Sequence, residues 1–235
     1  MSSSLTRPIK YISIEGNIGN GKSTLLRKLS QDPECQHLFV PLYEPLNEWL
    51  EIKDDQDRNL LQLYYDDKSR WSYTMQTFAF LTKMRNIKQA MEDIIENDKP
   101  RCIIAERSIL TDYHIFAKTC FEDGKMSTLE WNIYQNWFQW SYCEYIRKYL
   151  NNTQPKFIYL QLDPIESFNR IHKRSRQEEK TIPMEYLQHL HTMHESWLTS
   201  AEYEGDVCFI DATVDFENNE EEYQRIKTRI MEFVV

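Results

Sequence analysis

The residues best suited to chemistry lie near the start of this sequence, in the segment Gly16-Asn17-Ile18-Gly19-Asn20-Gly21-Lys22-Ser23-Thr24. This segment matches the pattern GxxxxGK[ST], follows an apolar run typical of a strand and opens a stretch typical of a helix. Its glycines let backbone N–H groups approach phosphate oxygens, and the helix N-terminus adds positive partial charge. We expect Lys22 to contact the β- and γ-phosphates of ATP or another nucleoside triphosphate, and Ser23 to ligate Mg²⁺.

A second candidate group is Glu106-Arg107-Ser108, at the carboxyl end of another predicted strand. Open parallel sheets bind their ligands at that end. We expect Glu106 to hold Mg²⁺ through water, and Arg107 to neutralise charge that develops on a transferring phosphoryl group. An isolated tripeptide of this kind also fits a salt bridge at a strand end, so the hypothesis depends on the neighbouring motifs.

Glu44 is a candidate general base. It follows a predicted strand and precedes Pro45, which holds its backbone extended so that the side chain can project over the carboxyl edge of the sheet. A carboxylate there can accept the proton of an attacking hydroxyl. A glutamate before proline is also typical of a solvated loop, and that alternative stays open.

Three arginines follow each other closely in a chain that is acidic overall. Arg170 and Arg174 share a face of a predicted helix, and Arg176 lies close by. Like charges so placed repel one another unless an anion binds between them. The pattern therefore predicts a lid, at about residues 170–181, that closes over a triphosphate, although a solvated surface explains it equally well.

Alternating strands and helices must position these residues. The predicted strands are Ile9–Glu15, His37–Tyr43, Arg101–Glu106, Lys156–Leu162 and Val207–Asp211. The predicted helices are Lys22–Ser30, Leu60–Asp66, Tyr73–Asn97, Ile109–Cys120, Thr128–Leu150, Pro164–Arg174, Pro183–Ser200 and Glu220–Phe233. This alternation predicts an α/β fold, a parallel sheet covered by helices on both faces. At 235 residues, we expect one domain spanning 1–235.

Composition and charge exclude several classes of protein. With 28 basic and 37 acidic residues the net charge is −9, which argues against nucleic acid as a partner. No apolar run approaches the roughly 18 residues that span a membrane. The segment Met1–Pro8 is polar, and the five cysteines form no CxxC pair, so we expect a reducing compartment, the cytoplasm.

The predicted helix Thr128–Leu150 is unusually aromatic. It carries Trp131, Tyr134, Trp137, Phe138, Trp140, Tyr142, Tyr145 and Tyr149. These eight residues exceed what one buried helix face ordinarily accommodates, so part of the helix is expected to form an interface between two copies of the chain. We therefore expect a homodimer.

Taken together, the motifs resemble those of the deoxynucleoside kinases, in particular the deoxycytidine/deoxyguanosine kinase branch. The likeness covers nearly the whole chain, through Ser13-Ile14-Glu15-Gly16-Asn17-Ile18-Gly19, Glu44-Pro45, Arg70-Trp71-Ser72, Gln76-Thr77, Glu106-Arg107-Ser108, Tyr134-Gln135-Asn136-Trp137, Ile158-Tyr159-Leu160-Gln161 and His194-Glu195-Ser196-Trp197-Leu198. It implies a dimeric P-loop kinase fold with a five-stranded parallel sheet. It also implies transfer of the γ-phosphate of ATP to the 5′-hydroxyl of a deoxynucleoside in nucleotide salvage.

The resemblance also implies roles for the matching residues. Glu44 is similar to the general base that takes the 5′-hydroxyl proton, with Arg107 beside it. Tyr65 and Glu195 resemble the pair that holds the sugar 3′-hydroxyl. Gln76 and Asp112 resemble the polar residues that recognise the nucleobase. Trp49, Met75 and Phe116 resemble the side chains that form the walls of the base-binding slot. Those that resemble the lid arginines and the loop beside the donor adenine are Arg170, Arg174, Arg176, Asp215 and Phe216.

Substrate choice rests on the base-facing residues. The amide of Gln76 can pair with N4 and N3 of cytosine, and adenine offers the same pattern. An ionised Asp112 accepts an amino proton and repels the O4 carbonyl of thymine. This predicts deoxycytidine as the favoured acceptor, with purine deoxynucleosides behind it. Lys83 and Met75 stand where this branch usually has arginine and phenylalanine, so a broader specificity is expected.

Two other functions fit parts of the pattern. A nucleoside monophosphate kinase such as a thymidylate kinase also has a P-loop, a parallel sheet and an arginine lid, but the carboxylate of Glu44 would repel its phosphorylated acceptor. A P-loop regulatory switch would hydrolyse nucleotide without any nucleoside, and the sequence has no evident guanine-reading motif.

Overall fold

The computed structural model describes residues 8–150, 153–174, 176–179, 181–200 and 205–234. The polar segment Met1–Pro8 lies outside the described residues except for Pro8, and the proposed lid at 170–181 includes residues 175 and 180, which also lie outside them.

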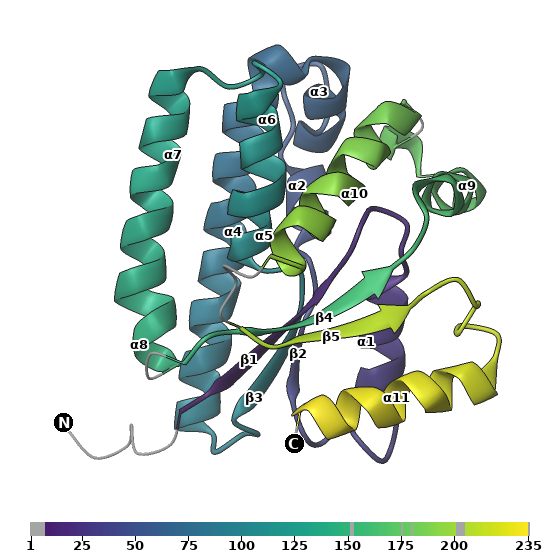
Figure 1. Ribbon diagram of the computed structural model, residues 1–235. Coiled ribbons are helices and arrows are strands. Elements are labelled where there is room, and N and C mark those ends of the chain that lie inside the picture. The colour runs from purple at the N-terminus through teal and green to yellow at the C-terminus, as the bar shows by residue number, and fades with distance from the viewer. Residues whose placement is uncertain (1–7, 151–152, 175, 180, 201–204, 235) are drawn as a thin grey trace.

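Within the described residues, five parallel strands form one sheet in the order β2-β3-β1-β4-β5 (Figure 1). They are β1 (Lys10–Glu15), β2 (Val40–Leu42), β3 (Cys102–Glu106), β4 (Lys156–Gln161) and β5 (Val207–Asp211). The register pairs Ile14 of β1 with Glu106 of β3, and Glu15 with Tyr159 of β4. The predicted α/β class with a five-stranded parallel sheet is confirmed, and the carboxyl ends of β1, β3 and β4 lie side by side.

Helices cover both faces of this sheet. Those described are α1 (Lys22–Gln31), α2 (Leu46–Glu51), α3 (Leu60–Asp66), α4 (Lys68–Glu96), α5 (Ile109–Thr111), η1 (Asp112–Ala117), α6 (Lys118–Glu122), α7 (Thr128–Ser141), η2 (Tyr142–Ile146), α8 (Arg147–Tyr149), α9 (Pro164–Arg174), η3 (Gln177–Glu179), α10 (Met184–Leu198) and α11 (Glu220–Val234). Leu26 of α1 and Ile230 of α11 pack in one buried cluster with Ile12, whereas Met91 of α4 packs with Tyr11 in the cluster of the opposite face. Successive residues of β1 therefore point to opposite faces of the sheet and pack into two separate hydrophobic cores.

Local signals explain where the elements differ from the predicted ones. Helix α4 begins at Lys68 and not at Tyr73, because the Asp67 side chain accepts a hydrogen bond from the backbone N–H of Arg70 and caps the helix. Helix α2, which was not predicted, begins directly after Pro45. The predicted helix Ile109–Cys120 contains the π-helical segment η1, whose wider turn a 3.6-residue period does not anticipate.

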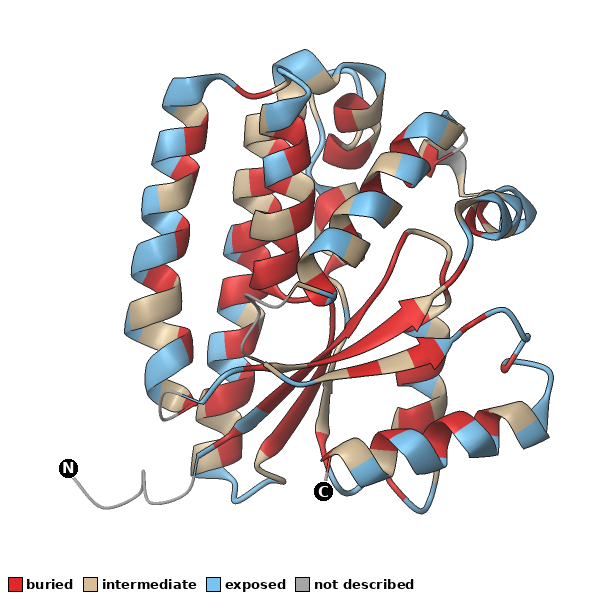
Figure 2. Cartoon of the chain, viewed as in Figure 1, coloured by how far each residue is buried: buried red, intermediate tan, exposed pale blue. Residues whose placement is uncertain are grey.

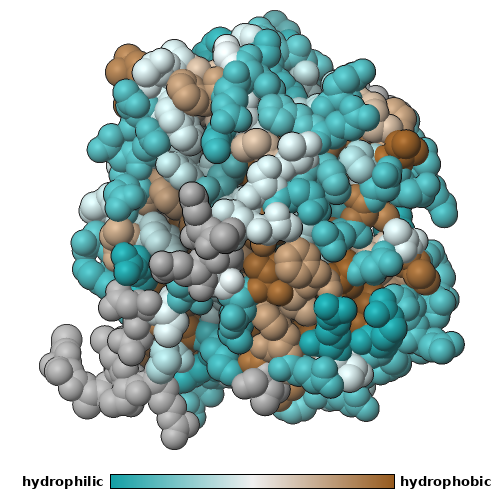
Figure 3. Space-filling model, in the orientation of Figure 1, coloured by the Kyte–Doolittle hydropathy of each residue, from teal (hydrophilic) through white to brown (hydrophobic). Residues whose placement is uncertain are grey.

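Burial follows the sheet. Figure 2 shows the central strands buried along most of their length, while α7 and α11 each present an exposed stripe. Figure 3 shows a mostly hydrophilic helical surface, with hydrophobic side chains gathered over β4 and β5, where the edge strand β5 leaves Val207 and Phe209 half-buried. Across the described residues, no helix is long and apolar enough to cross a membrane.

Candidate active site

A cleft of about 970 Å³ opens at the carboxyl ends of the strands. Its lining runs from the P-loop, through the ends of β2 and β3, to the side chains of α3, α4 and η1. Of the predicted site residues, those that line it are Ile18, Gly19, Gly21, Lys22, Ser23, Thr24, Glu44, Trp49, Tyr65, Met75, Gln76, Glu106, Arg107, Asp112, Phe116, Arg170, Arg174, Arg176, Asp215 and Phe216. The structure therefore brings most of the predicted residues to a single cavity.

Two asparagines anchor the P-loop without lining the cleft. The Asn17 amide donates to the carbonyl of Leu187 in α10 at 2.8 Å. The Asn20 amide donates to the carbonyl of Leu160 in β4 at 2.8 Å, and its oxygen accepts from the Ser167 hydroxyl at 2.7 Å. The loop is thus tied to the end of β4 and to the helix that carries the predicted lid arginines.

Two positions of the P-loop lie so close to neighbouring residues that they require glycine. Gly19 has φ +87°, and a Cβ there would lie 2.7 Å from the carbonyl oxygen of Ser167. Gly21 has φ +90°, and its Cβ would meet the Phe216 ring at 2.9 Å. An L-residue with a side chain would be strained at both positions, so glycine lets the loop pack against Ser167 at one position and against Phe216 at the other.

Lys22 is buried at the phosphate end of the cleft, where its Nζ donates to the carbonyl of Asn17 at 2.6 Å. Burial, and then the nearby Arg107 charge, lower the pKa of Lys22 to about 7, even though Glu106 and Glu44 act in the opposite direction. Among the described residues Lys22 makes no direct ion pair, and the triphosphate of a nucleotide would supply one.

Ser23 and Glu106 form a pair suited to Mg²⁺. The Ser23 hydroxyl donates to Oε1 of Glu106 at 2.5 Å, so a hydroxyl oxygen and a carboxylate oxygen meet beside the P-loop. Magnesium prefers oxygen ligands and commonly binds to one or two protein groups together with substrate phosphates. The donor set therefore fits Mg²⁺ held by Ser23 directly and by Glu106 directly or through water.

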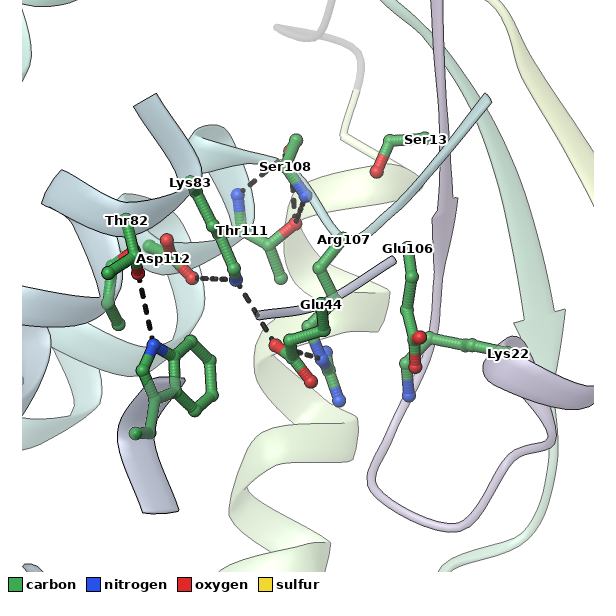
Figure 4. Close-up of polar contacts among 12 residues, drawn as sticks. Ser13, Lys22, Glu44, Thr82, Lys83, Glu106, Arg107, Ser108, Thr111 and Asp112 are labelled. Carbon is green, nitrogen blue, oxygen red and sulfur yellow. Dashed lines mark hydrogen bonds and ion pairs between the residues drawn. The ribbon is translucent and has the colours of Figure 1, made fainter. Parts of the chain in front are cut away.

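A cluster of opposite charges occupies the middle of the site (Figure 4). The Lys83 Nζ lies 2.6 Å from Oδ1 of Asp112 and 3.2 Å from Oε1 of Glu44. The Nε of Arg107 lies 3.7 Å from the same Glu44 oxygen, and its guanidinium lies over the Phe116 ring, 4.7 Å from the centroid. Lys83 itself does not line the cleft. It lies behind Glu44 and Asp112 and bridges them.

These contacts set the protonation of Glu44 and Lys83. Burial acts to raise the pKa of Glu44, but the charges of Lys83 and Arg107 outweigh it and hold that pKa below its ordinary value. Burial also acts to lower the pKa of Lys83, but the two carboxylates outweigh it and raise that pKa. Glu44 is therefore ionised at neutral pH, the state that a general base requires.

The far end of the cleft is a slot lined by aromatic and polar side chains. Trp49 is fixed by a hydrogen bond from its indole N–H to the Thr82 hydroxyl at 3.0 Å. The Oδ2 atom of Asp112 is buried and has no hydrogen-bond partner within the described part of the chain, whereas Oδ1 accepts from Lys83. Gln76 and Met75 of α4 line the same slot. An unpaired acceptor at a cleft wall is ready to receive a donor from a ligand.

The structure does not bring Glu195 into the cleft beside Tyr65, its predicted partner. Its carboxylate accepts from the Tyr159 hydroxyl at 2.8 Å and from the Gln161 amide at 3.1 Å, and it does not line the cleft. Glu179 does line the cleft, together with Tyr65, and is 4% exposed. The sequence reasoning missed Glu179. The signal available was an acidic pair, Glu178-Glu179, directly after the cluster of arginines.

The three arginines line the cleft and have different partners. Arg170 donates to the carbonyl of Ala212 at 2.8 Å, which ties α9 to the loop before Asp215. Arg174 and Arg176 both pair with Glu179, the latter at 2.5 Å. Two guanidinium groups thus share one buried carboxylate, an arrangement that a bound phosphate could replace by direct pairing.

Comparison with known proteins gives matches to a single family. A model of the deoxynucleoside kinase family matches residues 12–235. The chain is 35% identical over 252 residues to a mitochondrial deoxyguanosine kinase of Xenopus laevis, covering 100% of this chain and 93% of that protein. It is 35% identical over 249 residues to a deoxycytidine kinase of Homo sapiens, with 96% and 91% covered. It is 33% identical over 260 residues to deoxycytidine kinase 2 of Gallus gallus, with 100% and 94% covered.

Proposed function

Because the chain belongs to the deoxynucleoside kinase family, we propose that it transfers the γ-phosphate of ATP or another nucleoside triphosphate, with Mg²⁺, to the 5′-hydroxyl of deoxycytidine in preference to thymidine. The chain is a deoxynucleoside kinase, as its sequence motifs predicted. The donor, the metal, the favoured base and the roles of individual residues are the proposal.

The position of Glu44 carries this proposal. It lies in the cleft between the P-loop residue Lys22 and the slot formed by Trp49 and Gln76, and Lys83 keeps it ionised. A carboxylate at this point can accept a proton from a hydroxyl group. Against a monophosphate acceptor, the same carboxylate would be repulsive, which disfavours a thymidylate kinase activity.

On this proposal, each part of the cleft makes one contribution. Lys22, Arg174 and Arg176 hold the phosphates, with Arg174 and Arg176 leaving Glu179 as a lid closes. Mg²⁺ at Ser23 and Glu106 would neutralise phosphate charge. Glu44 accepts the 5′-hydroxyl proton, and Arg107 neutralises the charge that develops as the phosphoryl group moves.

One assay tests the proposed reaction against its alternatives. We expect ATP consumption to depend on an added deoxynucleoside, with deoxycytidine used most efficiently among the four. Turnover without nucleoside would favour a regulatory switch, and turnover with deoxynucleoside monophosphates alone would favour a monophosphate kinase.

For the sugar, we propose Glu179 with Tyr65 as the pair that binds the 3′-hydroxyl. The charges of Glu179 and Glu44 raise the pKa of Tyr65 further, after burial, so the tyrosine hydroxyl stays protonated and can donate. Glu179→Ala is expected to lower kcat/KM for deoxycytidine by about 10- to 150-fold, the usual worth of a hydrogen bond to a charged group. It should change kcat/KM for 2′,3′-dideoxycytidine little, because that analogue has no 3′-hydroxyl to lose.

Glu195→Ala is the matched control, since it removes a glutamate that pairs with Tyr159 and Gln161 outside the cleft. We expect it to preserve the ratio between deoxycytidine and dideoxycytidine. A ratio that collapses in Glu195→Ala and not in Glu179→Ala would restore Glu195 to the sugar site.

For the base, we expect wild type to favour deoxycytidine over thymidine by roughly 5- to 150-fold, because the unpaired Oδ2 of Asp112 would face an acceptor on thymine. Asp112→Ala should reduce that ratio. Lys83→Arg should raise it, because a guanidinium fork fixes Asp112 more firmly than a single ammonium does. The measurement is kcat/KM for both nucleosides in each variant, and a wild-type preference for thymidine would contradict the scheme.

A homodimer is proposed from the surface of α4 and α7. Trp137 and Trp140 of α7 are 53% and 50% exposed, and Leu129 and Ile133 of α7 and Leu81 of α4 are exposed as well. Sedimentation at micromolar concentration is expected to give twice the chain mass of 28.5 kDa. Trp137→Glu should yield monomer, whereas Ile52→Glu, at a similarly exposed residue of another surface, should leave the dimer intact.

The cytoplasm remains our prediction for the location of this kinase. It rests on the cysteine usage of the sequence. One relative carries the word mitochondrial in its name, so fractionation of cells that produce the tagged protein is the appropriate test.

A further inference from the structure

Glu15 is a buried carboxylate that the proposed reaction does not use. It ends β1 directly before the P-loop glycine Gly16 and is 0% exposed. A carboxylate in such a place is costly unless it is hydrogen-bonded, and an apolar residue would suffice if packing were all that the strand needed. The hydrogen bonds that Glu15 makes to its neighbours should therefore explain why a glutamate stands at this position.

Three hydroxyl groups converge on one oxygen of Glu15. Oε1 accepts from Ser13 at 2.5 Å, from Thr111 at 2.5 Å and from Ser108 at 3.2 Å. Ser13 belongs to the same face of the same strand, two residues earlier. Ser108 and Thr111 belong to a different segment, the turn that leaves β3 and opens α5. Glu15 thus joins the strand before the P-loop to that turn.

The turn that Glu15 contacts is locally strained. Arg107 has φ +60°, a left-handed conformation that residues other than glycine rarely adopt. Ser108 and Thr111 follow it and cap each other, since each hydroxyl accepts a hydrogen bond from the backbone N–H of the other residue. Figure 4 shows this pair beside Arg107. A strained residue persists only where its neighbours fix the backbone. Here the Arg107 N–H donates to the carbonyl of Ile14 at 3.1 Å, and the hydroxyls of Ser108 and Thr111 on Glu15 hold the residues that follow.

The direction of a proposed catalytic group depends on this turn. Glu106 is held in β3 and meets Ser23, while Arg107, the residue that follows it, reaches toward Glu44. A turn that relaxed at Arg107 would redirect the Arg107 side chain away from Glu44. The charge of Arg107 also reaches back to Glu15, where it opposes the rise in pKa that burial causes.

We infer that Glu15 is a positioning residue, which holds the Glu106-Arg107-Ser108 turn in its strained form through Ser108 and Thr111. The inference rests on the roles proposed above for Glu106 and Arg107. It assigns to the glutamate before the P-loop a task in aligning the phosphoryl-transfer groups, separate from nucleotide binding.

The direct variant, Glu15→Ala, empties a buried position in the sheet, so the test rests on Thr111→Val. This change keeps the shape of the side chain and removes the hydroxyl that joins the turn to Glu15, together with the acceptor that it offers to the backbone N–H of Ser108. We expect kcat to fall about 10- to 100-fold, as misplaced reacting groups cause, with KM for the deoxynucleoside and affinity for ADP within about threefold of wild type. Thr111→Ser restores the hydroxyl and should restore kcat.

Ser13→Ala is the matched control, because it also removes a donor that lies 2.5 Å from the same oxygen, but from the strand and not from the turn. Its kcat should stay within about threefold of wild type, while its melting temperature should fall about as far as that of Thr111→Val. Equal losses of kcat in the two variants, or an unchanged kcat in Thr111→Val, would overturn the inference. Arg107→Ala separates this result from the proposed function: if that variant kept full activity, the role proposed for Arg107 would be at fault.

Discussion

Replacing Glu44 by alanine is expected to lower kcat by about 10²–10⁴-fold, the range that a positioned general base contributes. The carboxylate lies in the cleft within 3.2 Å of Lys83 Nζ and 3.7 Å of Arg107 Nε, so it is both ionised and oriented. Of the other carboxylates that line the cleft, Glu106 pairs with Ser23 and Asp112 pairs with Lys83. Affinity for an ATP analogue, measured by calorimetry, should change little.

Glu48→Ala is the control for this experiment. Glu48 lies one turn further along the chain in α2, and its partner is the exposed Arg85 on the surface and not a group in the cleft. We expect wild-type kcat from this variant. A Glu44→Ala enzyme that kept more than about a tenth of wild-type kcat would show that the hydroxyl proton leaves by another route.

The pH dependence of the wild type provides a second check on Glu44. Because Lys83 and Arg107 hold its pKa below the ordinary value, the base form is present throughout the neutral range. As pH falls, kcat/KM should therefore be lost only below about pH 4.3, the ordinary value for a glutamate. An acid limb centred near neutral pH would mean that a different group acts as base.

The strands and the P-loop could be predicted because their signals are local. Strands of a parallel sheet appear in the sequence as short apolar runs, and the strand Val207–Asp211 has the predicted bounds. The helix Pro164–Arg174 also has its predicted bounds. Helix α4 begins earlier than predicted because Asp67 caps it, and this cap is a short-range signal that the sequence does contain. The π-helical segment that begins at Asp112 has no comparable sequence signal.

The positions of Glu179 and Glu195 could not be predicted from local patterns. Glu195 lies in the regular helix α10, but only the packing of that helix on β4 decides that it meets Tyr159 and Gln161. Glu179 lies in a polar segment without periodicity, and its place depends on Arg174 and Arg176. The bridging position of Lys83 likewise arises from contacts between α4, η1 and the end of β2.

The second large effect is expected from Lys22→Ala, which should lower kcat/KM for ATP by on the order of 10²–10³-fold, as removal of one preorganised donor to a developing charge does. Here the loss should appear with every acceptor and should include weaker binding of an ATP analogue, because Lys22 acts on the phosphates. Lys22→Arg should not restore activity. Its planar fork is larger than the ammonium, and the side chain is only 5% exposed beside the carbonyl of Asn17.

Lys227→Ala distinguishes loss of phosphate binding from loss of a buried lysine. Lys227 is 6% exposed and pairs with Asp32 at 3.0 Å and Glu34 at 2.6 Å, on α11 and away from the cleft. Removing it leaves Asp32 without that partner, so the melting temperature should fall while kcat/KM stays near wild type.

The stability of Lys22→Ala should differ from that of Lys227→Ala. Lys22 has a pKa lowered to about 7 by burial and by Arg107, so its positive charge adds little to the stability of the folded enzyme without nucleotide. Lys22→Ala should therefore retain or raise the melting temperature while transfer is lost, and a variant that kept transfer within tenfold of wild type would remove Lys22 from the phosphate site.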